Sequence, residues 1–276
     1  MRRFICYNSL QSDVISNEEP VELSEILVVV PHSGILIPNE IPIDSISDDF
    51  PRQMRNVDWY TNWLYNFRDI LGNSHLAFPY CSLILEANRH PESLDDCVPL
   101  KDTLGEPIYR AGHEPARELR QSLSSKYLQV FHQDISEEIT RGKTFLLDAH
   151  STVAARGVAD NQIELMNFQV SKLNDELTYF CPDVFIETYA SELAKRLSWV
   201  KVTVNQSKYY NVYGHICGAH SINAMTRIGN RVPAILQETN QKLYMNEDRT
   251  LDWEALETLR RAFAEALREM VRTVRQ

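Results

Sequence analysis

The sequence predicts an α/β fold in which helices flank a mixed, mostly parallel β-sheet. Short apolar segments of about six residues alternate along the chain with longer segments in which apolar residues recur every three or four positions. Short apolar runs are typical of strands buried on both faces, and the longer spacing is typical of amphipathic helices. No repeat, linker or break in composition divides the 276 residues, so we expect a single domain over residues 1–276.

Five apolar runs are expected to form the strands of this sheet. They are Ile26–Pro31, Ser82–Ala87, Thr144–Ala149, Trp199–Val204 and Val232–Gln237. Because segments with helical periodicity separate several of these runs, the strands are expected to lie in a mostly parallel or mixed sheet that is covered on both faces.

Three segments have the periodicity of amphipathic helices. The first, 57–71, carries apolar residues at three- and four-residue spacing, and the second covers about 115–140. The third runs through residues 253–274, and Asp252 is suited to cap its N-terminus. The polar segment Gln206–Arg231 lacks either periodicity and predicts loops and short strands.

Composition limits the classes of function. The 38 acidic and 28 basic residues give a formal charge of -10, which argues against a surface for nucleic acid or anionic membranes. Neither a signal peptide nor an apolar run of about 20 residues is visible. The five scattered cysteines include no CxxC pair, so we expect no disulfide framework and a reducing, cytoplasmic location. The oligomeric state stays open.

Polar residues follow four of the predicted strands. His32 follows the first, Asn88 and Arg89 the second, His150 the third and Glu238 the last. In open α/β sheets, ligands bind outside the carboxyl ends of the strands, so these side chains are expected to surround one crevice.

Two histidines and one carboxylate around a metal, with a further carboxylate as general base, make up the composition of hydrolytic zinc sites. Asp58, near the start of the first predicted helix, is a candidate for the third ligand. Asp148 lies two residues before His150 and therefore on the same strand face, where it could hold the imidazole in place.

Six segments, in order along most of the chain, resemble the N-formylglutamate amidohydrolase family. They read PHSGILIP, VDWYTNWLY, LILEANR, GEPIYRAGHEP, LLDAHS and AILQETNQKLYM. The resemblance implies a fold related to the zinc carboxypeptidases and the aspartoacylase group. It also implies an amidohydrolase that releases formate from N-formyl-L-glutamate, a small carboxylate-bearing substrate, in histidine degradation.

The resemblance assigns roles to individual residues. It implies that His32 and His150 bind one zinc ion per chain, with Asp58 as third ligand because position 35 is Ile rather than the Glu of the carboxypeptidase HxxE motif. Glu238 falls at the position of the catalytic carboxylate.

Substrate recognition is also implied. Asn88 and Arg89 match the residues that hold a substrate carboxylate, and an arginine suits a bidentate grip on that group. Because N-formylglutamate carries two carboxylates, a second cation is expected, with Arg110 and Arg227 as candidates.

The sequence departs from the family pattern at several places. Ala87 and His90 replace Leu and Pro in the family's Asp-Leu-Asn-Arg-Pro segment, and Tyr213–Gly218 replaces its Gly-Gly-Tyr-Ile-Thr-Arg segment. These differences leave two alternatives open, a hydrolase of another N-acyl amino acid or short peptide and a carboxylate-binding protein without turnover. His132 is expected to be a packed histidine, and His215 and His220 receive no functional role.

Overall fold

The computed structural model describes residues 23–153, 159–170, 177–206 and 232–274. Six strands form the main sheet and two more form a separate antiparallel pair. The main sheet contains β1 (Ile26–Val30), β2 (Ser74–Ala77), β3 (Phe145–Thr152), β4 (Gln162–Met166), β7 (Lys201–Val204) and β8 (Ala234–Asn240), and the pair consists of β5 (Phe168–Val170) and β6 (Leu177–Tyr179).

The main sheet has the strand order β2-β1-β3-β8-β4-β7. Its neighbours run parallel except at β8 and β4, which are antiparallel. The mixed, mostly parallel sheet predicted from the sequence is therefore confirmed. The central strands β3 and β8 are paired so that His150 lies beside Glu238.

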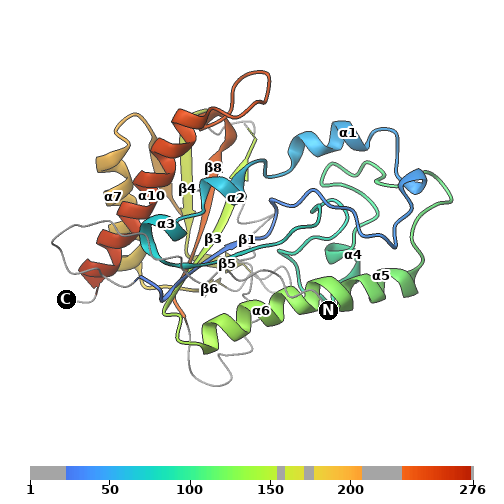
Figure 1. Ribbon diagram of the computed structural model, residues 1–276, viewed down its shortest axis with the longest axis horizontal. Helices are drawn as coiled ribbons and strands as arrows, with labels where there is room; N and C mark the ends of the chain where they lie inside the picture. The colour runs from blue at the N-terminus through green and yellow to red at the C-terminus, as the bar shows by residue number, and fades with distance from the viewer. Residues whose placement is uncertain (1–22, 154–158, 171–176, 207–231, 275–276) are drawn as a thin grey trace.

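Helices lie on both sides of the sheet (Figure 1). α7 and α10 pack against each other along one flank, and α6 passes the other flank. The α-helices are α1 (Phe50–Gln53), α2 (Thr61–Leu64), α3 (Arg68–Leu71), α4 (Leu94–Cys97), α5 (Arg117–Leu123), α6 (Gln129–Thr140), α7 (Asp183–Arg196) and α10 (Trp253–Val274). A π-helical turn, η3 (Ser124–Leu128), joins α5 to α6, and single 3-10 turns occur at η1 (Ile43–Ser45), η2 (Met54–Asn56) and η4 (Gln241–Leu243).

The alternation of side chains along the strands divides the apolar core into two layers. Leu147 and Ile235 pack with the residues of α7 and α10, and Leu146 and Leu236 pack with those of α6 and the loops before it. The predicted helices over 115–140 and 253–274 are confirmed as α5–η3–α6 and α10. Asp252 caps α10 as expected, since its Oδ1 accepts the N–H of Ala255 at 3.0 Å.

The predicted helix over 57–71 is wrong as a single element. Tyr60 adopts a left-handed conformation with φ 62° immediately before α2, and Tyr65 leaves the helical region before α3 begins. Asn66 occupies the break, and its Oδ1 accepts the Nε–H of Arg68 at 2.9 Å. The apolar spacing reflects burial of Leu64 and other residues on a common side rather than one continuous helix.

The predicted strand Ser82–Ala87 is also wrong. The chain forms a turn here, in which the carbonyl of Cys81 accepts the N–H groups of Ile84 and Leu85, both at 2.9 Å. Ile84, Leu85 and Ala87 are buried in the α6-side core, so the run is apolar for packing reasons. The edge of the sheet is instead β2, whose SHLA sequence carries little β-strand signal.

The sequence also led to expectations about membrane helices, the cysteines and the segment Gln206–Arg231. None of the described helices is long and apolar enough to cross a membrane. Cys81, Cys97 and Cys181 are free and buried. Most of the segment expected to form loops and short strands, 207–231, lies outside the described residues.

Candidate metal centre and substrate cavity

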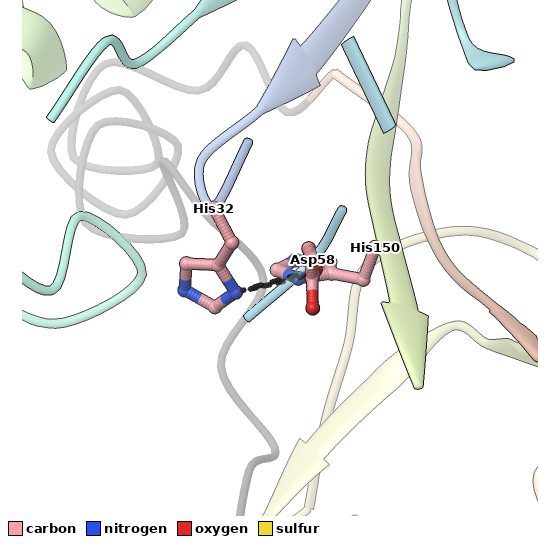
Figure 2. Close-up of side chains that lie close together, drawn as sticks. All are labelled: His32, Asp58 and His150. Atoms are coloured by element: carbon pink, nitrogen blue, oxygen red, sulfur yellow. Dashed lines mark hydrogen bonds and ion pairs between the residues drawn. The ribbon is translucent and has the colours of Figure 1, made fainter. Parts of the chain in front are cut away.

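Three side chains expected to bind a metal come together at the carboxyl ends of the central strands. His32 follows β1, Asp58 precedes α2, and His150 lies near the end of β3 (Figure 2). One ligand atom from each lies within 4.8 Å of the others. Among the described residues, no other cluster of three or more His, Cys, Asp and Glu side chains is arranged so that it could hold a metal ion.

The backbone around His150 explains why the site forms here. The ladder between β1 and β3 ends at Asp148, so the groups that follow on this edge need other partners. The Tyr65 hydroxyl donates to the His150 carbonyl at 2.9 Å, and the Ser151 N–H donates to Asp58 Oδ2 at 3.0 Å. Asp58 is therefore held in place by the strand that carries His150.

Gly34 fixes the path of the chain after His32. A Cβ on Gly34 would lie 2.2 Å from the Pro79 carbonyl carbon and 2.4 Å from the Tyr80 nitrogen. These are backbone atoms that cannot move aside independently, so only glycine allows this close approach. The contact brings the His32 segment against the chain that follows β2.

Two carboxylates orient the imidazoles. His32 Nε2 lies 2.5 Å from Glu86 Oε1, and His150 Nε2 lies 3.0 Å from Asp148 Oδ1. The two Nδ1 atoms then face each other at 3.2 Å, and each lies 3.5 Å from Asp58 Oδ2. Imidazole nitrogens and a carboxylate oxygen suit Zn²⁺, and metal-binding histidines typically donate their other N–H to a carboxylate. The donor set and its supports fit a zinc ion.

The contact of Asp148 with His150 agrees with the expectation from the sequence, whereas the contact of Glu86 with His32 was not predicted. The family resemblance held a signal, since Glu86 stands where the family pattern has Asp. Glu86 Oε1 also accepts the N–H of Asn88 at 2.8 Å, which ties this carboxylate to the adjoining segment.

In this cluster, contacts between opposite charges shift the pKa values in the direction opposite to the effect of burial. Burial alone would lower the pKa of His32, but the charge of Glu86 and hydrogen bonds with Asp58 and Glu86 raise it to about 9. Burial would likewise lower the pKa of His150, yet Asp148 and Asp58 raise it well above its usual value. Burial would raise the pKa of Asp58, but hydrogen bonds with His150 and His32 hold it below its ordinary range. Burial would also raise the pKa of Glu86, but the charge of His32 and its hydrogen bond, together with the charge of Arg89, lower it to about 2. The charges of the cluster are mutually stabilising.

Glu238 stands beside the cluster. It is the register partner of His150 on β8, and both residues line the same cavity. Its Oε2 is buried without a hydrogen-bond partner among the described residues. Burial, together with the nearby charges of Asp58 and Asp148, raises the pKa of Glu238 to about 8. A carboxyl group with this property can hold or release a proton near neutral pH.

The cavity next to the cluster has a volume of about 560 Å³. Asn88 and Arg89 line it, although they follow a turn rather than the strand expected from the sequence. Asn88 Nδ2 lies 3.4 Å from His150 Nε2, and Arg89 donates to the Asn88 carbonyl at 2.8 Å. Besides Arg89 and the two histidines, Lys101 is the basic side chain that lines the described part of the cavity, and no sequence pattern predicted it there.

The structure locates some candidates elsewhere. Arg110 forms an ion pair with Asp48 at 2.5 Å and lines a separate, smaller hollow. Arg227, His215 and His220 lie outside the described residues. His132 is buried and donates to the Ala87 carbonyl at 3.0 Å, and burial lowers its pKa to about 4. It is a packed histidine, as expected.

The fold and the site define a class of α/β protein in which two imidazoles and a carboxylate converge beside a cavity at the carboxyl ends of the strands. The sequence model of the N-formylglutamate amidohydrolase family matches residues 24–245. The chain therefore belongs to that family.

Two curated relatives carry the name N-formylglutamate deformylase. The protein of Pseudomonas aeruginosa is 30% identical over 142 residues, and that of Pseudomonas putida is 28% identical over 142 residues. Each alignment covers 46% of this chain and 51% of the relative, so the match spans about half the length of these proteins.

Two solved structures share the fold over nearly the whole chain. The gene product Atu2144 of Agrobacterium tumefaciens has a TM-score of 0.67 at 15% identity, and the alignment covers 92% of both chains. The N-formylglutamate amidohydrolase of Ralstonia eutropha JMP134 has a TM-score of 0.64 at 17% identity, covering 91% of this chain and 94% of that one.

Proposed function

We propose that this protein is a zinc-dependent amidohydrolase that releases formate from N-formyl-L-glutamate or a closely related N-acyl amino acid. The observation that carries the proposal is the convergence of His32, Asp58 and His150 beside Glu238 at one wall of a cavity. Family membership and the name of the two curated relatives support the same reaction class.

His32, Asp58 and His150 would hold one zinc ion per chain. Bound there, zinc would act as a Lewis acid and lower the pKa of a coordinated water to about 7. Glu86 and Asp148 keep the imidazoles oriented through their Nε2 atoms and leave both Nδ1 atoms directed at Asp58. The protein thus supplies a preorganised set of ligands rather than one that assembles on binding.

Glu238 is the proposed general base and acid. One of its carboxylate oxygens accepts a proton from the attacking water, and the resulting carboxylic acid donates it to the departing amine as the C–N bond breaks. A pKa of about 8, raised chiefly by burial, permits both transfers near neutral pH. Its place beside His150 keeps it next to the ligand cluster.

Asn88 and Arg89 are proposed to hold the α-carboxylate of the substrate. Both line the cavity, and the guanidinium of Arg89 can bind a carboxylate through two parallel hydrogen bonds. The proposal also includes a cytoplasmic location, which the scattered cysteines favour, and a step in histidine degradation, which the family resemblance implies.

The decisive experiment measures metal content together with formate release from N-formyl-L-glutamate, with and without a chelator. We expect about one zinc per chain and formate release that stops when the metal is removed and returns when zinc is restored. A panel of N-formyl, N-acetyl and larger N-acyl amino acids separates the preferred substrate from a broader acylase. Absence of metal after reconstitution would overturn the proposed chemistry, and zinc binding without turnover of any amide would leave a carboxylate-binding protein.

A further inference from the structure

Lys101 lies on the wall of the candidate substrate cavity. Its side chain is exposed, and together with Arg89 it supplies the permanent positive charges that line the described part of the cavity. The described residues offer it neither an ion pair nor a side-chain hydrogen bond. By contrast, Lys126, Lys143 and Lys242 each lie against a carboxylate.

The position of Lys101 is fixed by a tight turn. Lys101 pairs with Pro107 across the base of the turn, and Gly105 at the tip has φ 85°. Asp102 closes the turn, because its Oδ1 accepts the N–H groups of Leu104 and Glu106, both at 2.9 Å. The lysine therefore projects from an ordered backbone, which lowers the entropic cost of ligand binding.

Most acidic groups around the cavity are engaged elsewhere. Asp95 forms an ion pair with Arg120 at 2.7 Å, and Asp102 accepts the two backbone N–H groups of its turn. Asp58 and Glu86 contact the histidines of the candidate metal centre. Asp96 and Glu238 also line the cavity, and within the described part of the chain no ion pair joins Lys101 to any of these carboxylates, so its ammonium group is available to a ligand.

We propose that Lys101 is a specificity-determining residue that binds the side-chain carboxylate of a dicarboxylic N-acyl amino acid. This inference rests on the proposed function, in which Arg89 holds the α-carboxylate. Lys101 is better placed for the second carboxylate than Arg110, which is paired with Asp48 and lines a different hollow. A cavity of about 560 Å³ is large enough for a substrate of this size.

The test compares Lys101→Met with the wild-type protein, both loaded with zinc, on N-formyl-L-glutamate and on N-formyl-L-glutamine, an isostere that keeps the α-carboxylate but has an uncharged side chain. Methionine keeps much of the lysine stem and removes the charge. We expect KM for N-formylglutamate to rise about tenfold, the size of one charge-assisted hydrogen bond, with kcat changed less than about twofold. The constants for N-formylglutamine should change little. Lys201→Met, at an exposed lysine on β7, is the matched control.

Calorimetric binding of N-formylglutamate and of glutamate provides a readout that does not depend on turnover. If wild type binds these dicarboxylates but releases no formate, weaker binding by Lys101→Met still supports Lys101 while the proposed reaction fails. Equal losses for the glutamate and glutamine compounds, or no loss for either, would overturn the role of Lys101. Absence of dicarboxylate binding by wild type would also overturn it.

Discussion

His32 Nε2 and Glu86 Oε1 form a 2.5 Å contact that decides which imidazole nitrogen faces the candidate metal centre. With Nε2 occupied by the carboxylate, Nδ1 of His32 points to Asp58 and to the second histidine, His150. In the proposed zinc site Glu86 would therefore be a positioning residue, and the charge it places behind the ring would favour metal binding by making the imidazole a better electron donor.

Replacing Glu86 with glutamine removes that charge and keeps the size of the side chain. We expect zinc affinity to fall by about tenfold or more, because loss of such outer partners commonly weakens metal binding by that amount. Competition with a chromophoric chelator measures it. Glu92→Gln, at an exposed carboxylate of the same segment, is the control. Unchanged affinity in Glu86→Gln would remove Glu86 from the metal centre.

A substitution at Glu238 should impair catalysis and leave metal binding unchanged. Glu238→Gln keeps the volume and removes the proton acceptor, so we expect kcat for formate release to fall by about 10²–10⁴-fold while zinc content stays at one per chain. Steady-state kinetics and metal analysis on the same preparation check both parts. Glu187→Gln, on the exposed surface of α7, should retain full activity. Full activity in Glu238→Gln would require another general base.

Gly34 offers a test of how the backbone positions His32. Gly34→Ala forces a Cβ into the Pro79–Tyr80 backbone, at contacts of 2.2–2.4 Å, so the two segments must separate. We expect a loss of about 2–4 kcal/mol in the free energy of unfolding, as for severe overpacking. Urea denaturation measures it. Ser33→Ala should change stability little, and a fully stable Gly34→Ala protein would show that the contact relaxes without cost.

Most strands that the sequence predicted correctly have apolar runs that are buried in the central part of the sheet. The strands β1, β3 and β8 were located because their apolar runs lie in the central sheet, and α10 was located because its apolar stripe extends over 22 residues. The run Ser82–Ala87 is equally apolar but packs as a turn, since a short buried segment has the same composition whichever backbone it adopts. β2 and β4 were missed because polar residues interrupt their apolar pattern.

Some residues of the candidate site could likewise be predicted from the sequence, and others could not. His32, Asp58 and His150 could be proposed from residue type and order, because few side chains bind zinc. The proposed roles of Glu86 and Lys101 depend on turns that bring residues from separate segments to one cavity wall, and no local spacing encodes such a contact. Arg110 shows the converse, since its motif gave no sign of its ion pair with Asp48.

His75 should make the folded protein sensitive to acid. It is buried on β2 with Nε2 2.9 Å from Asn62 Oδ1, and burial lowers its pKa to about 4 from an ordinary value of 6.5. The neutral form is therefore preferred in the folded state, whereas the unfolded chain takes up a proton below about pH 6.5. The stability that depends on neutral His75 is fully present above that pH and is lost as the pH falls towards 4.

The size of this effect follows from the difference between the two pKa values. A shift of this extent corresponds to about 3 kcal/mol in the free energy of unfolding between pH 7 and pH 4. Urea denaturation of wild type and His75→Gln at both pH values measures it, since glutamine can still donate to Asn62 but does not titrate. We expect the variant to lose less stability on acidification than wild type, and the exposed control His113→Gln to behave like wild type. Parallel losses in all three proteins would show that His75 is not the group that takes up the proton.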